Sequence, residues 1–253
     1  DETRPQVTVL SDGRVLFTWQ KITVVNDQNT TDIAARVGEV DATGIFHWLG
    51  DEFTVNDWTQ GPQTETQAIE LADGRILFVW QGNAPPSQGG GDQTEISARI
   101  GSIDAVGTLS WEGSQFIVND QLASYQELPQ VIQLADGSLL FTWQSYASPN
   151  NESDSGISAR RGIPNEIGTI DWVSGEFAVD SQIPFGQIQP QVVEWLDGHV
   201  VFTWASQKTF DNAVSTEVVG RIFTFAPTGF IEEQPISLPV SVAPADADGS
   251  EAI

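Results

Sequence analysis

The chain has 253 residues, with 35 acidic against 10 basic side chains and a formal net charge of −25 at neutral pH. This charge excludes electrostatic binding to nucleic acid or to an anionic membrane, because both need clusters of Lys and Arg to meet phosphate groups. The absence of cysteine excludes disulfides, thiolate nucleophiles and Cys-ligated zinc. Hydrophobic residues make up 40% of the chain, including nine Trp and 13 Phe, so we expect a folded protein with a substantial core.

The first residue, the lack of a long apolar run and the composition indicate the location that we expect for the protein. The chain begins at Asp1 and contains no apolar run of 18 residues, so we expect neither membrane insertion nor a secretory leader in it. We therefore interpret it as a mature protein or as part of a larger secreted polypeptide or assembly. An acidic, lysine-poor surface without cysteine is typical of extracellular or saline conditions. We expect a secreted bacterial protein.

Four copies of one pattern follow one another along the chain. Each copy has an Asp-Gly pair followed by an apolar, aromatic stretch, and the pairs begin at Asp12, Asp73, Asp136 and Asp197, in steps of 61, 63 and 61 residues. An Arg and a Gly eight residues after it recur with the same step, the arginines being Arg36, Arg99, Arg160 and Arg221. Each unit opens on a glutamine, at Gln6, Gln67, Gln130 and Gln191. Self-similarity at a fixed period is the sequence mark of a repeat architecture.

The first unit shows the strands that each copy predicts. In chain order they are a strand at 6–10, an Asp-Gly turn at 11–13, a strand at 15–20, a polar loop at 26–32, a strand at 34–40, a turn at 41–44 and a last strand ending at 53–55. Glycine in the Asp-Gly pair accepts the positive φ that a two-residue hairpin needs. Apolar periodicity typical of a helix is not seen in any unit.

Four antiparallel strands per unit predict an all-β, four-bladed β-propeller built from four repeats of about 61–63 residues. We predict a single propeller domain over 1–240, with an acidic C-terminal tail at 241–253 and blades at approximately 5–60, 61–123, 124–184 and 185–240. Two other arrangements remain open: two sandwich-like domains of two repeats each, and a larger ring completed by another copy of the chain.

Residues that recur in all four units are predicted to be structural, because every blade solves the same packing problem. We expect the recurring tryptophans, Trp19, Trp80, Trp143 and Trp204, to lie in the core. We expect the recurring arginines to clamp neighbouring strands or blades, because a partly buried guanidinium needs carboxylate or carbonyl acceptors.

Ligand sites are predicted in the variable loops. Aromatic rings beside amides suit stacking on sugar rings, so the candidate ligand-binding residues are Trp58, Tyr125, Phe185, Gln63, Gln126 and Gln187. The long loops between the second and third strands carry oxygen ligands of the kind that Ca²⁺ accepts. The candidate metal ligands are Asp27, Asp32, Asp92, Glu95, Glu152, Asp154, Asp211 and Glu217. A solvated acidic surface or aromatics that fix loops to the blades would explain the same residues, and the sequence leaves both interpretations open.

Catalytic motifs give little support for an enzyme, because neither a nucleophile elbow, a phosphate-binding loop nor a zinc-protease motif occurs. The sequence therefore favours a non-catalytic extracellular binding or adhesion module whose partner is a glycan or a protein, with calcium as the candidate cofactor. Two alternatives remain: a structural subunit that packs on partner proteins, and a hydrolase with its site at the propeller mouth.

One family shares these motifs. The segments Asp12–Trp19, Ala35–Gly44 and Glu52–Asn56, with their three further copies, resemble the "DGGFVVTW", "AQRFDADG" and "EFQVN" repeats of large secreted bacterial proteins of the RTX, haemolysin-type calcium-binding class. The resemblance covers nearly the whole chain and implies a secreted module in a calcium-rich setting. The glycine-rich nonapeptide that binds calcium in that class is absent here, so the resemblance transfers neither a calcium site nor catalytic residues.

Overall fold

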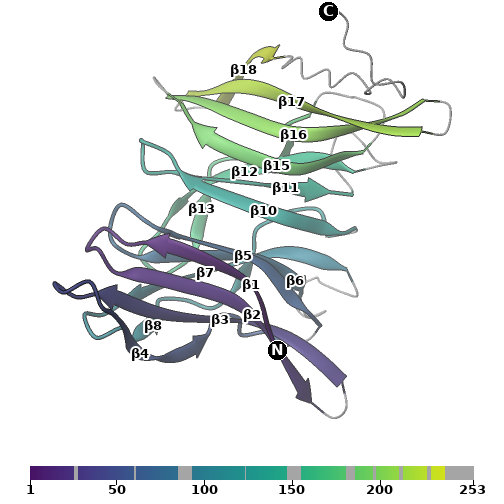
Figure 1. Cartoon of the computed structure of the whole chain (residues 1–253). Coiled ribbons are helices and arrows are strands. Elements are labelled where there is room, and N and C mark those ends of the chain that lie inside the picture. Colours follow the sequence, from purple (N-terminus) through teal and green to yellow (C-terminus); the bar gives the residue numbers. More distant parts are fainter. Residues whose placement is uncertain are drawn as a thin grey trace, which may run out of the picture.

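Four antiparallel sheets follow one another along the chain, one for each sequence unit (Figure 1). They are seen in a computed structural model, which describes residues 1–25, 28–59, 61–84, 93–122, 124–146, 155–180, 186–195, 198–210, 213–226 and 229–236. The arrangement confirms the predicted all-β, four-bladed β-propeller fold. In the described part of the chain, no helix is long and apolar enough to cross a membrane.

The first two blades have the strand order of their sequence units. The first blade contains β1 (Glu2–Val9), β2 (Val15–Val25), β3 (Gln28–Val40) and β4 (Phe46–Thr54). The second contains β5 (Gln63–Glu70), β6 (Ile76–Asn83), β7 (Thr94–Ile103), β8 (Leu109–Trp111) and β9 (Phe116–Ile117). In the second blade the outer strand is split, because β8 and β9 both pair with β7.

The last two blades repeat this plan. The third contains β10 (Gln126–Gln133), β11 (Leu139–Ser145), β12 (Gly156–Pro164), β13 (Ile170–Trp172) and β14 (Phe177–Ala178), with β13 and β14 both on β12. The fourth contains β15 (Gln187–Glu194), β16 (His199–Phe210), β17 (Ala213–Ala226) and β18 (Gly229–Ile236). The first strand of each blade is its innermost strand.

In the first three blades the Asp-Gly pairs form the predicted hairpin turns between the first and second strands, and Asp197 of the fourth pair lies outside the described residues. The glycines Gly13, Gly74, Gly137 and Gly198 all have φ between +76° and +89°. In the first turn the amide of Arg14 donates to Asp12 Oδ1 at 2.9 Å, and the second turn repeats this bond at 3.0 Å. A side chain in place of these glycines would be strained, so the pair fixes the register of each hairpin.

Each blade has two apolar faces. At each of the three junctions between consecutive blades, one face of each blade is buried against the other. We call the face that carries Phe78 and Trp80 in the second blade the a face, and the face that carries Leu77 and Ile96 the b face. The b face of one blade packs on the a face of the next, which gives three separate core clusters. Trp80, Trp143 and Trp204 lie in these clusters, as the sequence predicted.

Three of the four recurring arginines, Arg99, Arg160 and Arg221, tie their blade to the one before it. Arg99 donates to the carbonyl of Val55 at 3.1 Å and pairs with Asp57 at 2.7 Å. Arg160 makes the same contacts with Val118 and Asp120, at 2.8 and 2.7 Å. These contacts cross blade boundaries and confirm the predicted clamp.

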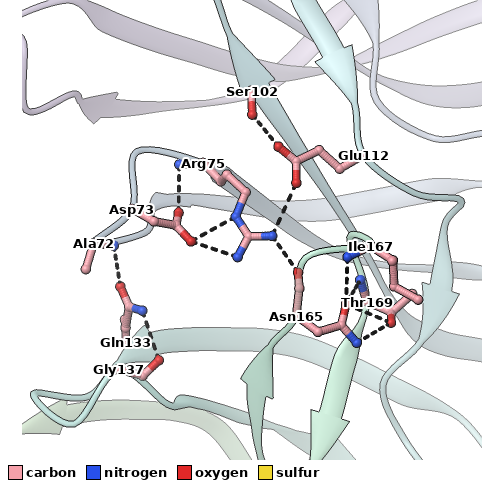
Figure 2. A network of polar contacts seen from close by, with 10 residues as sticks. All are labelled: Ala72, Asp73, Arg75, Ser102, Glu112, Gln133, Gly137, Asn165, Ile167 and Thr169. Atoms are coloured by element: carbon pink, nitrogen blue, oxygen red, sulfur yellow. Dashed lines mark hydrogen bonds and ion pairs between the residues drawn. The ribbon is translucent and has the colours of Figure 1, made fainter.

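A second set of polar contacts joins the blades at the hairpin end (Figure 2). Arg75, beside the second Asp-Gly turn, donates to the carbonyl of Asn165 in the third blade at 2.6 Å and to Glu112 at 3.2 Å. The amide of Ala72 donates to Gln133 of the third blade at 2.7 Å. Arg75 thereby reaches the turn between β12 and β13, and the Ala72 bond joins the inner hairpin of the second blade to the innermost strand of the third.

The four blades form an arc with two free ends. The first and fourth blades stand at opposite ends of the stack in Figure 1, and in the described part of the chain no strand of one packs extensively on a strand of the other. Val7, on the a face of the first blade, is 62% exposed, whereas Val131 at the matching place in the third blade is fully buried. Among the described residues, apolar side chains are therefore exposed at both ends of the arc.

Candidate functional site

The innermost strands of all four blades line one cavity of about 450 Å³, which we call the axial cavity. Its wall residues are Gln6 from β1, Glu65, Thr66 and Gln67 from β5, Leu128, Pro129 and Gln130 from β10, and Gln189, Pro190 and Gln191 from β15. The central side of a propeller is where its strands converge, and rigid strands can hold side chains there in fixed positions. The axial cavity is therefore the candidate site.

A β-bulge occurs at the same place in each innermost strand. The pairing register shifts between Thr64 and Gln67 in the second blade, and at the matching residues of the other three. Within each bulge one residue other than glycine has a positive φ of 50–56°, namely Arg4, Glu65, Leu128 and Gln189. Such backbone costs of order 1–3 kcal/mol and persists only where the surroundings enforce it. Bulges of this kind redirect side chains beside functional sites.

Glutamines of the preceding blade hold the bulges in place. The amide of Leu128 donates to Gln81 Oε1 of the second blade at 2.8 Å. The amide of Gln189 donates to Gln144 Oε1 of the third blade at 3.4 Å. Three residues after Leu128 in β10, the amide of Val131 donates to Gln67 Oε1 of the second blade at 2.7 Å. The cavity wall is thus braced by bonds between blades.

The chemistry of the wall is mainly that of amides. Four glutamines that open the sequence units, Gln6, Gln67, Gln130 and Gln191, all face the cavity. A primary amide both donates and accepts, so it matches the hydroxyl groups of a sugar. Among the described residues that line the cavity, Glu65 is the one carboxylate, and it forms an ion pair with Arg4 of the first blade.

A second carboxyl group lies next to the wall. Glu127 directly precedes the lining residue Leu128 in β10 and is half-buried, but it is not itself one of the residues that line the cavity. Burial raises the pKa of the Glu127 carboxyl, because desolvation disfavours its charged form. Glu65 therefore lines the cavity as a carboxylate paired with Arg4, and Glu127 is a neighbouring carboxyl group in the chain whose pKa is raised by burial.

The predicted ligand-binding residues are not gathered at this cavity. Gln63, Gln126 and Gln187 are fully buried and accept from the indole N–H of Trp80, Trp143 and Trp204 at 2.8, 2.8 and 2.6 Å. Trp58 is half-buried beside Asn56, and Tyr125 is exposed, with its ring edge-on to Tyr146. Phe185 lies outside the described residues. The burial of the three glutamines corrects their expected place on a ligand-accessible surface, and ligand binding by the set as a whole stays a prediction.

The predicted metal ligands that the structure describes lie apart. Asn56 donates to Asp32 at 2.8 Å and Asn119 donates to Glu95 at 2.6 Å, and each asparagine also accepts from a third-strand amide. Glu217 lies on β17. The other proposed ligands, Asp27, Asp92, Glu152, Asp154 and Asp211, fall outside the described residues. Within the described ranges no three acidic or histidine side chains form a metal cluster, so calcium binding stays a prediction.

Glu95 should make the stability of the protein depend on pH. Its side chain is fully buried, and desolvation, with the nearby charge of Glu176, raises its pKa to about 7. Between pH 4.5 and 7 the folded state therefore keeps a proton that the unfolded state has released. Because protons then bind preferentially to the folded state, the free energy of unfolding falls as pH rises through this window.

We expect Glu95→Gln to raise the free energy of unfolding at pH 8 by about 2 kcal/mol and to flatten the decline between pH 4.5 and 7. Glutamine keeps an acceptor for Asn119 without a buried charge. Urea unfolding at a series of pH values measures the effect. Asp32→Asn is the control for exchanging an acid for an amide, because Asp32 holds the matching position of the first blade and accepts from Asn56. If the unfolding free energy of Glu95→Gln still fell with pH as steeply as that of the wild type, Glu95 would not be the cause of the pH dependence.

Comparison with solved structures identifies the fold. The chain is similar to the Penicillium chrysogenum alpha-L-arabinanase complexed with arabinobiose, with 14% identity, a TM-score of 0.60, and coverage of 90% of this chain and 64% of that one. It is similar to the GH93 alpha-L-arabinofuranosidase of Fusarium graminearum with arabinobiose, at 14% identity, TM-score 0.58 and coverage of 90% and 64%. A thermostable family-43 glycoside hydrolase matches at 15% identity, TM-score 0.55 and coverage of 94% and 77%. No family model and no curated protein matches the chain.

These neighbours correct the sequence-based expectation of function. Glycoside hydrolases with a propeller fold recur among them, so the predicted non-catalytic binding or adhesion module is contradicted, as is the expectation that the chain is not an enzyme. Identities of 10–15% show the fold alone. The chain also spans less than two thirds of the length of the first two structures named here. The resemblance to RTX repeats and the secreted location stay predictions.

Sequence reasoning missed the axial cavity although its signal was present. Glutamine opens every unit, and proline precedes it in three of them, at Pro5, Pro129 and Pro190. Proline inside a strand is typical of a bulge, because it cannot donate to the ladder. Because these residues recur in the units, the sequence predicts that they are structural. The structure shows that a recurring residue can also line a shared cavity, because each blade contributes one copy.

Proposed function

We propose that the protein is a glycoside hydrolase that binds its saccharide in the axial cavity. The observation that carries this proposal is the cavity wall, where four glutamines and Glu65 converge on bulged innermost strands. Amides suit sugar hydroxyls, and a cavity of about 450 Å³ is of the size typical of small-molecule sites. The propeller glycoside hydrolases among the structural neighbours support the same class of activity.

Glycoside hydrolysis uses two carboxyl groups in different protonation states. Burial favours the protonated form of Glu127, which suits a general acid that protonates the departing glycosidic oxygen. Glu65 lines the cavity as the partner of Arg4, which suits a carboxylate that activates water or attacks the anomeric carbon. The two roles fall on equivalent bulges of neighbouring innermost strands, β5 and β10.

Arabinose-containing oligosaccharides are the first substrates to test, because two of the neighbours are complexes with arabinobiose. We expect release of reducing sugar from arabinan fragments, with activity that falls as pH rises and Glu127 loses its proton. Glu65→Gln and Glu127→Gln should each lower the rate by about 100-fold or more, because each removes one acid–base group. Glu39→Gln, an exposed acid on β3, is the matched control and should keep full activity.

Two results would overturn the proposal. One is an absence of hydrolysis across arabino-, xylo- and fructo-oligosaccharides by a protein that calorimetry shows to be folded. The other is hydrolysis that survives unchanged in both Glu65→Gln and Glu127→Gln, since the reaction would then take place elsewhere.

A further inference from the structure

The two end faces of the arc are halves of a junction that the chain builds three times within itself. At each internal junction, b-face residues of one blade enter the a face of the next. Val131 on the a face of the third blade and Ile96 on the b face of the second are both fully buried in one such cluster. Their counterparts at the ends, Val7 on the first blade and Val218 on the fourth, are 62% and 45% exposed.

The a face of the first blade carries the same aromatic residues as an a face inside the arc, but no blade packs on it among the described residues. Phe17, Trp19 and Trp48 line a groove of about 350 Å³ on this face. In the second blade the same positions are held by Phe78, Trp80 and Trp111, which pack in the cluster between the first two blades. The indole nitrogen of Trp19 is buried and has no hydrogen-bond partner in the described part of the chain.

Arg36 lacks the contact that its equivalents make. Arg99 and Arg160 reach a carbonyl and an aspartate of the preceding blade. Arg36 donates only to the carbonyl of Gly50, within its own blade, among the contacts of the described residues. A blade placed before the first one would therefore complete both an apolar cluster and an arginine clamp.

The free b face of the fourth blade supplies matching residues. Val218 stands where Ile33, Ile96 and Ile157 are fully buried in the first three blades. Trp195, also exposed, stands where Leu10, Leu71 and Leu134 are buried. This face is thus the same kind of surface that fills an a face inside the chain.

We propose that the end faces bind a second copy of this chain head to tail, so that the fourth blade of each copy packs on the first blade of the other. The occupant is a second copy because the two exposed faces continue an interface that the chain already forms three times between its own blades. Two such junctions related by a two-fold axis close a ring of eight blades, within the range that propellers adopt. This association does not rest on the proposed hydrolase activity.

Light scattering coupled to size-exclusion chromatography tests the proposal with the full chain. We expect a mass twice the 27.5 kDa of one chain. V7E and V218K each place a charge in the apolar junction and should weaken self-association by about 100-fold. I167E is the control, because Ile167 is also exposed but lies in the turn between β12 and β13, outside both end faces. Circular dichroism checks that each variant is folded.

Mixing the two variants tests the head-to-tail geometry. A V7E copy paired with a V218K copy has one wild-type junction and one in which the new opposite charges face each other, so the mixture should dimerise although each variant alone does not. The proposal would be overturned if the wild-type protein had the mass of one chain at all protein concentrations. It would be overturned equally by variants that remain dimeric, or by a folded mixture that stays monomeric at the highest protein concentration.

Discussion

Replacing Trp143 with alanine is expected to lower the free energy of unfolding by about 4 kcal/mol, the cost typical of removing a large buried aromatic side chain. Trp143 is fully buried in the cluster between the second and third blades. Its indole N–H also donates to Gln126 at 2.8 Å, so truncation would leave a buried acceptor without its donor. Urea unfolding followed by circular dichroism measures the loss.

Two phenylalanine variants separate the packing from the hydrogen bond. Trp143→Phe keeps most of the ring and loses the bond to Gln126, so we expect it to cost about 1–2 kcal/mol. It also serves as the informative variant if Trp143→Ala does not fold. Trp19→Phe is the matched control, because Trp19 holds the same place in the first blade, where its indole has no partner among the described residues. A cost for Trp143→Ala below 1 kcal/mol would contradict the assignment of this residue to the core.

The blades could be predicted from sequence because their signal is local and repeated. Asp-Gly pairs specify hairpins, alternating apolar residues specify strands, and four copies at nearly equal steps specify blades. The arginine clamp followed from the energetic cost of burying an unpaired guanidinium. Each of these inferences needed only one unit and its neighbours along the chain.

The site could not be predicted in the same way, because it depends on which residues meet across blades. Gln63, Gln126 and Gln187 looked like surface amides beside aromatic residues, but each lies opposite a tryptophan 17 residues later in the chain and bonds to its indole. Glu65 and Leu128 share a cavity only because both strands bulge at the same level. Sequence spacing carries little information about such a convergence.

The sequence does not favour an enzyme, and the reason is physical. Glycoside hydrolysis needs two carboxyl groups that differ in environment, and a chain with 35 acidic residues gives no pattern that marks two of them. The difference between Glu65 and Glu127 arises from burial and from the contact with Arg4, and both are properties of the folded arc. Charge and composition described the surface of the protein and left its cavity undetermined.

Arg160→Met is expected to cost about 3 kcal/mol of unfolding free energy, because it breaks a partly buried clamp between two blades. The guanidinium of Arg160 donates to the carbonyl of Val118 at 2.8 Å, pairs with Asp120 at 2.7 Å, and lies 3.9 Å from the centre of the Trp172 ring. Methionine fills much of the space but supplies no donor. The carbonyl and the aspartate are then left without their shared partner.

The stability lost in Arg160→Met should come more from the missing planar set of guanidinium N–H donors than from the missing charge. Arg160→Lys keeps the charge but loses the planar group that lies over Trp172, so we expect it to recover less than half of the loss. Asp120→Asn should cost about 1 kcal/mol or less, because the aspartate side chain is 41% exposed and water can replace its partner. Lys21→Met, which removes an exposed pair with Glu52, is the control and should change stability by less than about 0.5 kcal/mol. Equal costs for Arg160→Met and Lys21→Met in urea unfolding would show that the clamp does not stabilise the junction, and the apolar clusters alone would then hold the blades together.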